Sequence, residues 1–71
     1  MTQEDLFERA AECARMIEAT SNPANREMLT HLRSLWINLA NESAILSDAE
    51  LAEQITAVTR IHADLMRSAA Q

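Results

Sequence analysis

Few residues in this chain have the chemistry of a catalytic or metal-binding site: two histidines, one cysteine and eleven acidic residues. Glu27 and His31 are four positions apart, which would place a carboxylate and an imidazole on one helix face. A closed zinc site needs four ligands, and a di-iron site in a helical bundle needs two Glu-x-x-His pairs, which this sequence lacks. We therefore interpret the spacing of Glu27 and His31 as a coincidence.

His62 and Cys13 each fall in the apolar stripe of an expected helix. Val58 and Leu65 lie one turn to either side of His62, so we expect a histidine at the edge of the core that bonds to a carboxylate or carbonyl. A pH-sensitive or metal-binding role is the alternative, because imidazole titrates near neutrality. Cys13 has no neighbouring cation or helix N-terminus to activate its thiol. We expect it to be a small apolar core residue, with a redox or intersubunit role as the alternative.

The remaining candidates are the acidic pairs Glu8–Glu12 and Glu50–Glu53, which are typical of solvent-exposed helix surfaces rather than of general acid–base catalysis. The sequence contains no glycine, and hence no glycine-rich phosphate loop. It also contains no Cys–His cluster and no Ser-His-Asp set in a recognisable order. We therefore expect no enzyme, no catalytic residue, no resident cofactor and no metal ion.

The 71 residues carry a net charge of −5, and all six basic residues are arginine. An acidic chain without a basic stripe is poorly suited to nucleic acid or to anionic membranes, because neutralising phosphates supplies most of that affinity. The first residues are acidic, and no apolar run reaches the ~20 residues of a membrane span. A single cysteine fits a reducing compartment. We expect a cytoplasmic protein that binds neither nucleic acid nor membranes.

The spacing of apolar residues predicts an all-α fold in which one domain, 1–71, contains helices at about 3–20, 23–42 and 48–69. Each boundary coincides with residues that favour the start of a helix. These are Thr2 before the first helix, Asn22 and Pro23 before the second, and Ser47 with Glu50 before the third.

The turn at 20–23 is so short that the first two helices must form an antiparallel hairpin. Counting outward from the turn places Trp36 opposite the small side chain of Ala10, and Cys13 opposite Leu32. A large side chain that faces small ones lets two helices interlock. We expect the third helix to complete a three-helix bundle, which dimerisation would extend; packing within one chain and exchange with a second chain both remain open.

Part of the hairpin carries a sequence pattern that reads A-E-C followed by T-x-x-P-x-x-R, L-x-x-L and W-x-x-L-A. The residues that carry it are Ala11, Glu12, Cys13, Thr20, Pro23, Arg26, Leu29, Leu32, Trp36, Leu39 and Ala40. The pattern resembles a group of short helical proteins of alphaproteobacteria that have no assigned activity, and it departs from them at Arg33, where alanine is usual. The likeness covers about 11–42; it implies a helical protein and carries over no site residue. Arg26 is expected to reach Glu18 or the last carbonyls of the first helix.

A chain of this length is close to the lower limit for a self-sufficient core. About nineteen sizeable apolar side chains are available for burial, among them Phe7, Met28, Ile45 and Ile61. We expect a non-enzymatic interaction module that forms a two-fold homodimer or binds another protein. The alternative is a metal- or ligand-binding helical bundle that uses His62 and His31 with nearby carboxylates. The residues expected at the interface are Trp36, Ile37, Met16 and Met66.

Overall fold

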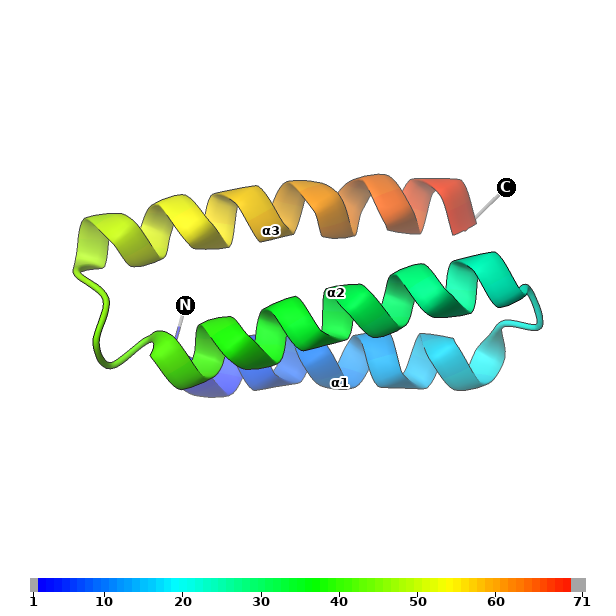
Figure 1. Ribbon diagram of the computed structural model, residues 1–71, viewed down its shortest axis with the longest axis horizontal. Helices are drawn as coiled ribbons and strands as arrows, with labels where there is room; N and C mark the ends of the chain where they lie inside the picture. Colours follow the sequence, from blue (N-terminus) through cyan, green and yellow to red (C-terminus); the bar gives the residue numbers. More distant parts are fainter. Residues whose placement is uncertain (1, 70–71) are drawn as a thin grey trace.

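Three α-helices make up most of the computed structural model, which describes residues 2–69 (Figure 1). α1 spans Gln3–Ala19, α2 spans Pro23–Glu42 and α3 spans Asp48–Ala69. The predicted all-α, three-helix fold is confirmed, and the predicted boundaries hold except that the first helix ends one residue earlier. None of these helices is both long and apolar enough to cross a membrane.

Side-chain caps fix where each helix begins. The Thr2 hydroxyl accepts from the Asp5 N–H at 3.2 Å, and the Asp5 carboxylate accepts from the Thr2 N–H at 2.9 Å. Asn22 accepts from the first two free N–H groups of α2. Ser47 and Glu50 exchange the same reciprocal pair of bonds at the start of α3. These contacts satisfy N–H groups that have no partner within a helix, and the predicted caps are confirmed.

Hydrogen bonds close the α1–α2 hairpin at both ends. At the turn, the Thr20 N–H bonds to the Met16 carbonyl at 3.0 Å, and the Arg26 guanidinium donates to the Thr20 carbonyl at 3.0 Å. This confirms the prediction that Arg26 reaches the last carbonyls of the first helix. At the far end, the Gln3 amide donates to the Ala40 carbonyl at 3.1 Å. The two helices are therefore held in register from end to end.

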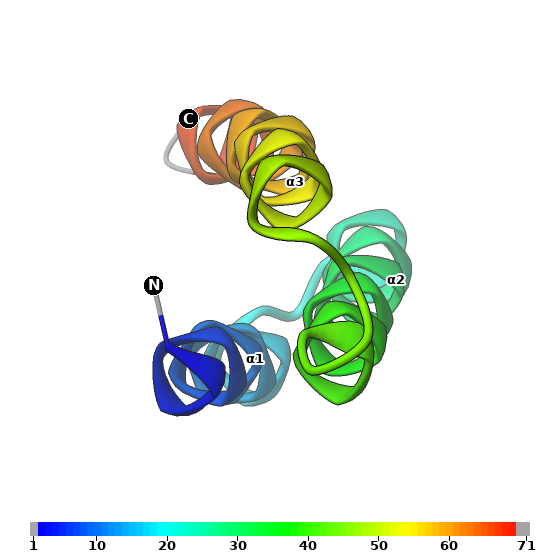
Figure 2. The same ribbon diagram turned by 90° about the vertical axis from the view of Figure 1, so that its left-hand side faces the viewer.

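Seen along the helix axes, α2 occupies the corner between α1 and α3 (Figure 2). It packs against both neighbours, whereas no Cα atom of α1 lies within 8 Å of a Cα atom of α3 in residues 2–69. Helices that pack closely through apolar faces are separated by about 8–10 Å between their axes. The three helices thus form an open arrangement, in which α3 has one close helical neighbour and reaches α1 only through side chains.

One hydrophobic cluster forms the core, and all three helices contribute to it. The residues predicted to face each other across the hairpin, Ala10 with Trp36 and Cys13 with Leu32, all belong to this cluster. α1 and α2 supply most of it, so the hairpin seam is the best-packed part of the molecule. The buried members are Leu6, Ala10, Cys13, Leu29, Leu32, Trp36, Leu39, Ala40, Val58 and Leu65.

Four large apolar side chains that were expected to be available for burial are instead exposed. The exposed fraction is 41% for Phe7, 56% for Met28, 48% for Ile61 and 82% for Ile45. Ile45 belongs to the segment between α2 and α3, where no helix face carries it inward. The other three lie at the edges of their apolar stripes, and an open arrangement of three helices does not cover those edges.

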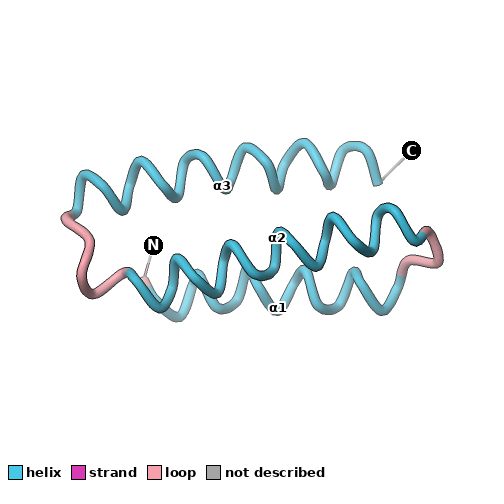
Figure 3. Tube along the Cα trace, viewed as in Figure 1, coloured by secondary structure: helices cyan, strands magenta, loops and turns pink. Residues whose placement is uncertain are grey.

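Two short segments, 20–22 and 43–47, connect the helices (Figure 3). In the described part of the chain no residue has a positive φ angle and no peptide bond is cis. The second segment is built from tight turns, in which the Ile45 and Leu46 N–H groups both bond to the Glu42 carbonyl. Both connections therefore use ordinary backbone conformations.

The contact between Arg26 and the end of α1 predicts a small stability effect. We expect Arg26→Ala to lower the free energy of unfolding by about 0.5–1 kcal/mol, which for a domain of this size lowers Tm by roughly 2–8 °C. Thermal unfolding followed by circular dichroism measures this change. Arg33→Ala is the matched control, because Arg33 is an exposed arginine of the same helix without a hydrogen bond in the described residues. Equal Tm values for the two variants would contradict the prediction.

Candidate functional site

A hydrogen bond between Trp36 of α2 and His62 of α3 joins the third helix to the hairpin. The indole Nε1–H donates to His62 Nδ1 across 3.1 Å. The two rings meet edge to face, with centroids 5.9 Å apart and an interplanar angle of 69°. Trp36 is fully buried, and 12% of the His62 side chain is exposed. Because Nδ1 accepts this bond, the imidazole is neutral and carries its proton on Nε2.

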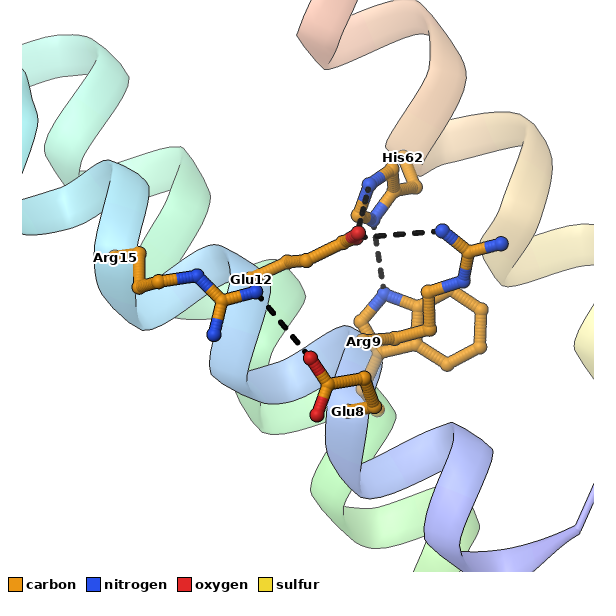
Figure 4. A network of polar contacts seen from close by, with 6 residues as sticks. Glu8, Arg9, Glu12, Arg15 and His62 are labelled. Carbon is orange, nitrogen blue, oxygen red and sulfur yellow. Dashed lines mark hydrogen bonds and ion pairs between the residues drawn. The ribbon is translucent and has the colours of Figure 1, made fainter.

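The other imidazole nitrogen faces the carboxylate of Glu12 on α1 (Figure 4). His62 Nε2 and Glu12 Oε2 are 3.6 Å apart, which is longer than a hydrogen bond. The same Glu12 oxygen lies 3.3 Å from Nη1 of Arg9. Glu12, expected as a solvated surface acid, is therefore partly enclosed between α1 and α3. The series of polar contacts through Trp36, His62, Glu12 and Arg9 therefore links all three helices.

The other ion pairs lie on the helix surfaces, as the sequence predicts for most of the acidic residues. Glu8 pairs with Arg15 at 3.4 Å, and Asp64 pairs with Arg67 at 2.6 Å. All four side chains are more than half exposed, so water screens these attractions and each contributes little to stability. They provide a solvated helix surface and no enclosed site.

Burial lowers the pKa of His62 below its ordinary value of 6.5. The Glu12 carboxylate acts in the opposite direction, because it favours the charged imidazolium, and the nearby Arg9 guanidinium lowers the pKa further. The bond from the Trp36 indole also favours the neutral ring, since it needs the lone pair on Nδ1. His62 is therefore neutral at physiological pH, in agreement with a histidine at the edge of the core.

The geometry of His62 leaves it poorly suited to catalysis or metal binding. Its one lone pair accepts the Trp36 hydrogen bond, and its one N–H faces Glu12, so no nitrogen is free to take a proton or a metal ion. In residues 2–69 no three histidine, cysteine, aspartate or glutamate side chains lie close enough together to hold a metal. Glu27 and His31 line a groove elsewhere on the molecule, described below.

Cys13 lies at the centre of the hairpin seam and has no exposed surface. Burial raises the pKa of its thiol, the adjacent Glu12 carboxylate raises it further, and Arg33 acts in the opposite direction. A thiol that stays protonated and buried is a weak nucleophile. The expectation of a small apolar core residue is confirmed.

A groove of about 530 Å³ runs between the first half of α2 and the last half of α3. Leu32 and Leu65 are buried in the walls of the groove, whereas Met28 and Ile61 line it with about half of their surface exposed. Its other lining residues are Asn25, Glu27, His31, Asp64 and Ser68. This groove carries the largest exposed apolar side chains found on the described helix faces apart from Phe7.

The four residues predicted to form an interface do not line this groove. Trp36 is fully buried within its own chain, so it cannot touch a partner while α3 is in place. Met16, Ile37 and Met66 are half-buried and pack against the core cluster. Met28 and Ile61, which the sequence placed in apolar stripes, are the exposed apolar side chains of the groove.

Comparison of the chain with family models, with curated proteins and with solved structures finds no match. The resemblance to short alphaproteobacterial proteins therefore stays a prediction.

The burial of Cys13 predicts a slow thiol. At pH 8 we expect a chromogenic disulfide reagent to modify Cys13 at least about tenfold more slowly in the native protein than in the protein unfolded in urea. The reagent can reach the thiol of the native protein only when the seam opens. The matched control combines Cys13→Ala with Ala44→Cys, which moves the only thiol to an exposed position in the 43–47 segment. Comparable rates for the native protein and this control would contradict the prediction.

The lowered pKa of His62 predicts that acid weakens the fold. In the unfolded chain His62 binds a proton near pH 6.5, whereas in the folded chain it does so only at lower pH. The stabilisation that comes from keeping His62 neutral is therefore complete above pH 6.5 and is lost as the pH falls toward the pKa of the folded state. We expect the free energy of unfolding, measured with urea, to be lower at pH 5.0 than at pH 7.5. His31→Gln should keep this difference and His62→Gln should reduce it. A wild-type protein equally stable at both values would contradict the prediction.

Proposed function

We propose that this protein is a non-enzymatic interaction module that associates with a second copy of itself through the groove between α2 and α3. The observation that carries the proposal is the exposure of Met28 and Ile61 on facing walls of that groove. Apolar side chains that line a hollow favour a protein partner, because association removes them from water. The occupied lone pair of His62 gives no comparable support to a metal-binding bundle.

A second copy of the chain can occupy the groove through two-fold symmetry. The acidic residues that line it are Glu27 on the α2 wall and Asp64 on the α3 wall, and Asp64 is already paired with Arg67. A two-fold axis across the groove would set the α2 wall of one copy against the α3 wall of the other. Met28 and Ile61 of both copies would then be covered, so burial of apolar surface stabilises this arrangement.

The size of the core supports the same proposal. α3 contributes two buried side chains, Val58 and Leu65, to the cluster, and its remaining apolar residues are partly covered. A dimer that encloses Met28 and Ile61 would add apolar burial next to this thinly packed helix. A cytoplasmic setting and the absence of nucleic-acid partners, both expected from composition, belong to the proposal.

Light scattering coupled to size-exclusion chromatography tests the homodimer. We expect a mass of about twice the 7.9 kDa of one chain for the wild type, and a mass close to one chain for Ile61→Ser, which removes an apolar side chain from the groove. Ile45→Ser is the matched control, because Ile45 is an equally large and more exposed side chain that does not line the groove.

A monomeric wild-type protein at tens of micromolar would exclude the homodimer. A dimer that survives Ile61→Ser but dissociates in Ile45→Ser would keep self-association and exclude the groove as its site.

A further inference from the structure

α3 is the least firmly held helix in the molecule. Its backbone has one close helical neighbour, and its buried apolar side chains are Val58 and Leu65, neither of them fully enclosed. The hairpin, in contrast, is closed at its turn by the bond from Arg26 and at its far end by the bond from Gln3. Segments with few buried contacts open at lower free energy than the rest of a fold. α3 is therefore the part of this fold that a local change can detach.

Protonation of His62 changes the contact that joins α3 to the hairpin. An imidazolium ion donates from both nitrogens and has no lone pair. The Nδ1–H group would then point at the Trp36 Nε1–H group from 3.1 Å, so two donors would face each other. The structure offers the indole no other acceptor in the described residues, and Trp36 is fully buried. A buried donor without a partner is unfavourable as long as water is excluded.

We propose that protonation of His62 releases α3 from the α1–α2 hairpin and exposes the face of α2 that contains Trp36. Release lets water satisfy the indole N–H and hydrate the charged ring. The 43–47 segment serves as the pivot, because it is the only non-helical stretch between α2 and α3. α1 and α2 remain packed, since none of the bonds that close the hairpin involves His62.

The charged groups that face His62 both come from α1. Glu12 attracts the imidazolium ion and opposes release, whereas Arg9 repels it and shares the same Glu12 oxygen at 3.3 Å. α2 contributes the uncharged indole of Trp36. The pair between Glu12 and the imidazolium ion is therefore weakened by a cation already in place, and it does not replace the lost indole bond.

Release of α3 also removes one wall of the groove. If the groove is the dimer interface, the chain should dissociate over the same pH range in which α3 is released; this consequence rests on the proposed function. The release itself concerns a contact within one chain, so it can be tested whether or not the protein is dimeric.

Hydrogen exchange measured by NMR tests the release helix by helix. Between pH 7.5 and 5.0, after correction for the pH dependence of intrinsic exchange, we expect amides of α3 to lose at least tenfold in protection while those of α1 and α2 keep theirs. Trp36 is the only tryptophan, so the fluorescence maximum should shift to longer wavelength over the same range. The midpoint of both changes should coincide with the titration of His62 followed by its own ring resonances.

Two substitutions on α1 should move this midpoint in opposite directions. Glu12→Gln removes the group that stabilises the imidazolium ion within the fold and opposes release, so it should shift the midpoint of release to higher pH. Arg9→Gln removes the group that repels the ion there, so it should shift the midpoint of release to lower pH. Glu8→Gln is the matched control, because Glu8 is an exposed acid of the same helix that pairs with Arg15, and it should leave the midpoint unchanged.

His62→Gln supplies an uncharged side chain at the same position, and it should abolish the pH-dependent loss of α3 protection. Loss of protection in all three helices together, an unchanged α3 at pH 5.0, or release that persists in His62→Gln would each overturn the proposal. If His62→Gln does not fold, the shifts of the release midpoint in Glu12→Gln and Arg9→Gln test the proposal instead. The midpoint of a release unrelated to His62 would not shift in opposite directions in these two variants.

Discussion

The arrangement of the three helices depends on one constraint: the N–H group of a fully buried indole needs an acceptor. Trp36 is fully buried and belongs to the same core cluster as the small residues Ala10 and Cys13 of α1. Carbonyl groups within a helix are already bonded, so the acceptor has to come from elsewhere. His62 on α3 supplies it. The position of the third helix is thus set by a polar requirement of the core as much as by the burial of Val58 and Leu65.

That solution has consequences for the chemistry the protein can perform. The imidazole that fixes α3 uses its lone pair within the fold, and the carboxylate nearest to it, Glu12, is shared with Arg9. His62 and Glu12 are therefore engaged within the fold. On its outside the molecule exposes apolar side chains along the α2–α3 groove.

Local features of the fold were predictable from the sequence, because their partners are near in the chain. Asn22 and Ser47 cap the helices that follow them, and Arg26 reaches a carbonyl six residues away. The burial of Cys13 and Trp36 followed from helical periodicity. In each case the interaction depends on helix geometry alone, which the spacing of residue types specifies.

The contacts of α3 were not predictable in the same way. The sequence placed His62 at the core edge with a bond to a carboxylate or carbonyl, whereas its hydrogen bond is to Trp36 and Glu12 lies 3.6 Å away. The rotation of α3 relative to the hairpin depends on packing between distant segments, which spacing within a helix does not specify. One signal was available: a tryptophan assigned to the core needs an acceptor, and His62 is the apolar-face residue best able to provide one. The exposure of Met28 and Ile61 was missed because a wide apolar stripe does not reveal how many neighbours cover it.

The absence of glycine, together with connections that avoid positive φ angles, affects how much disorder the chain gives up on folding. Residues such as Ser21 and Ala44 carry a Cβ atom, which restricts the backbone even before the helices assemble. A chain with fewer unfolded conformations loses less entropy when it becomes ordered. The ten apolar side chains buried in residues 2–69 can then hold together a chain whose connecting segments contain no glycine.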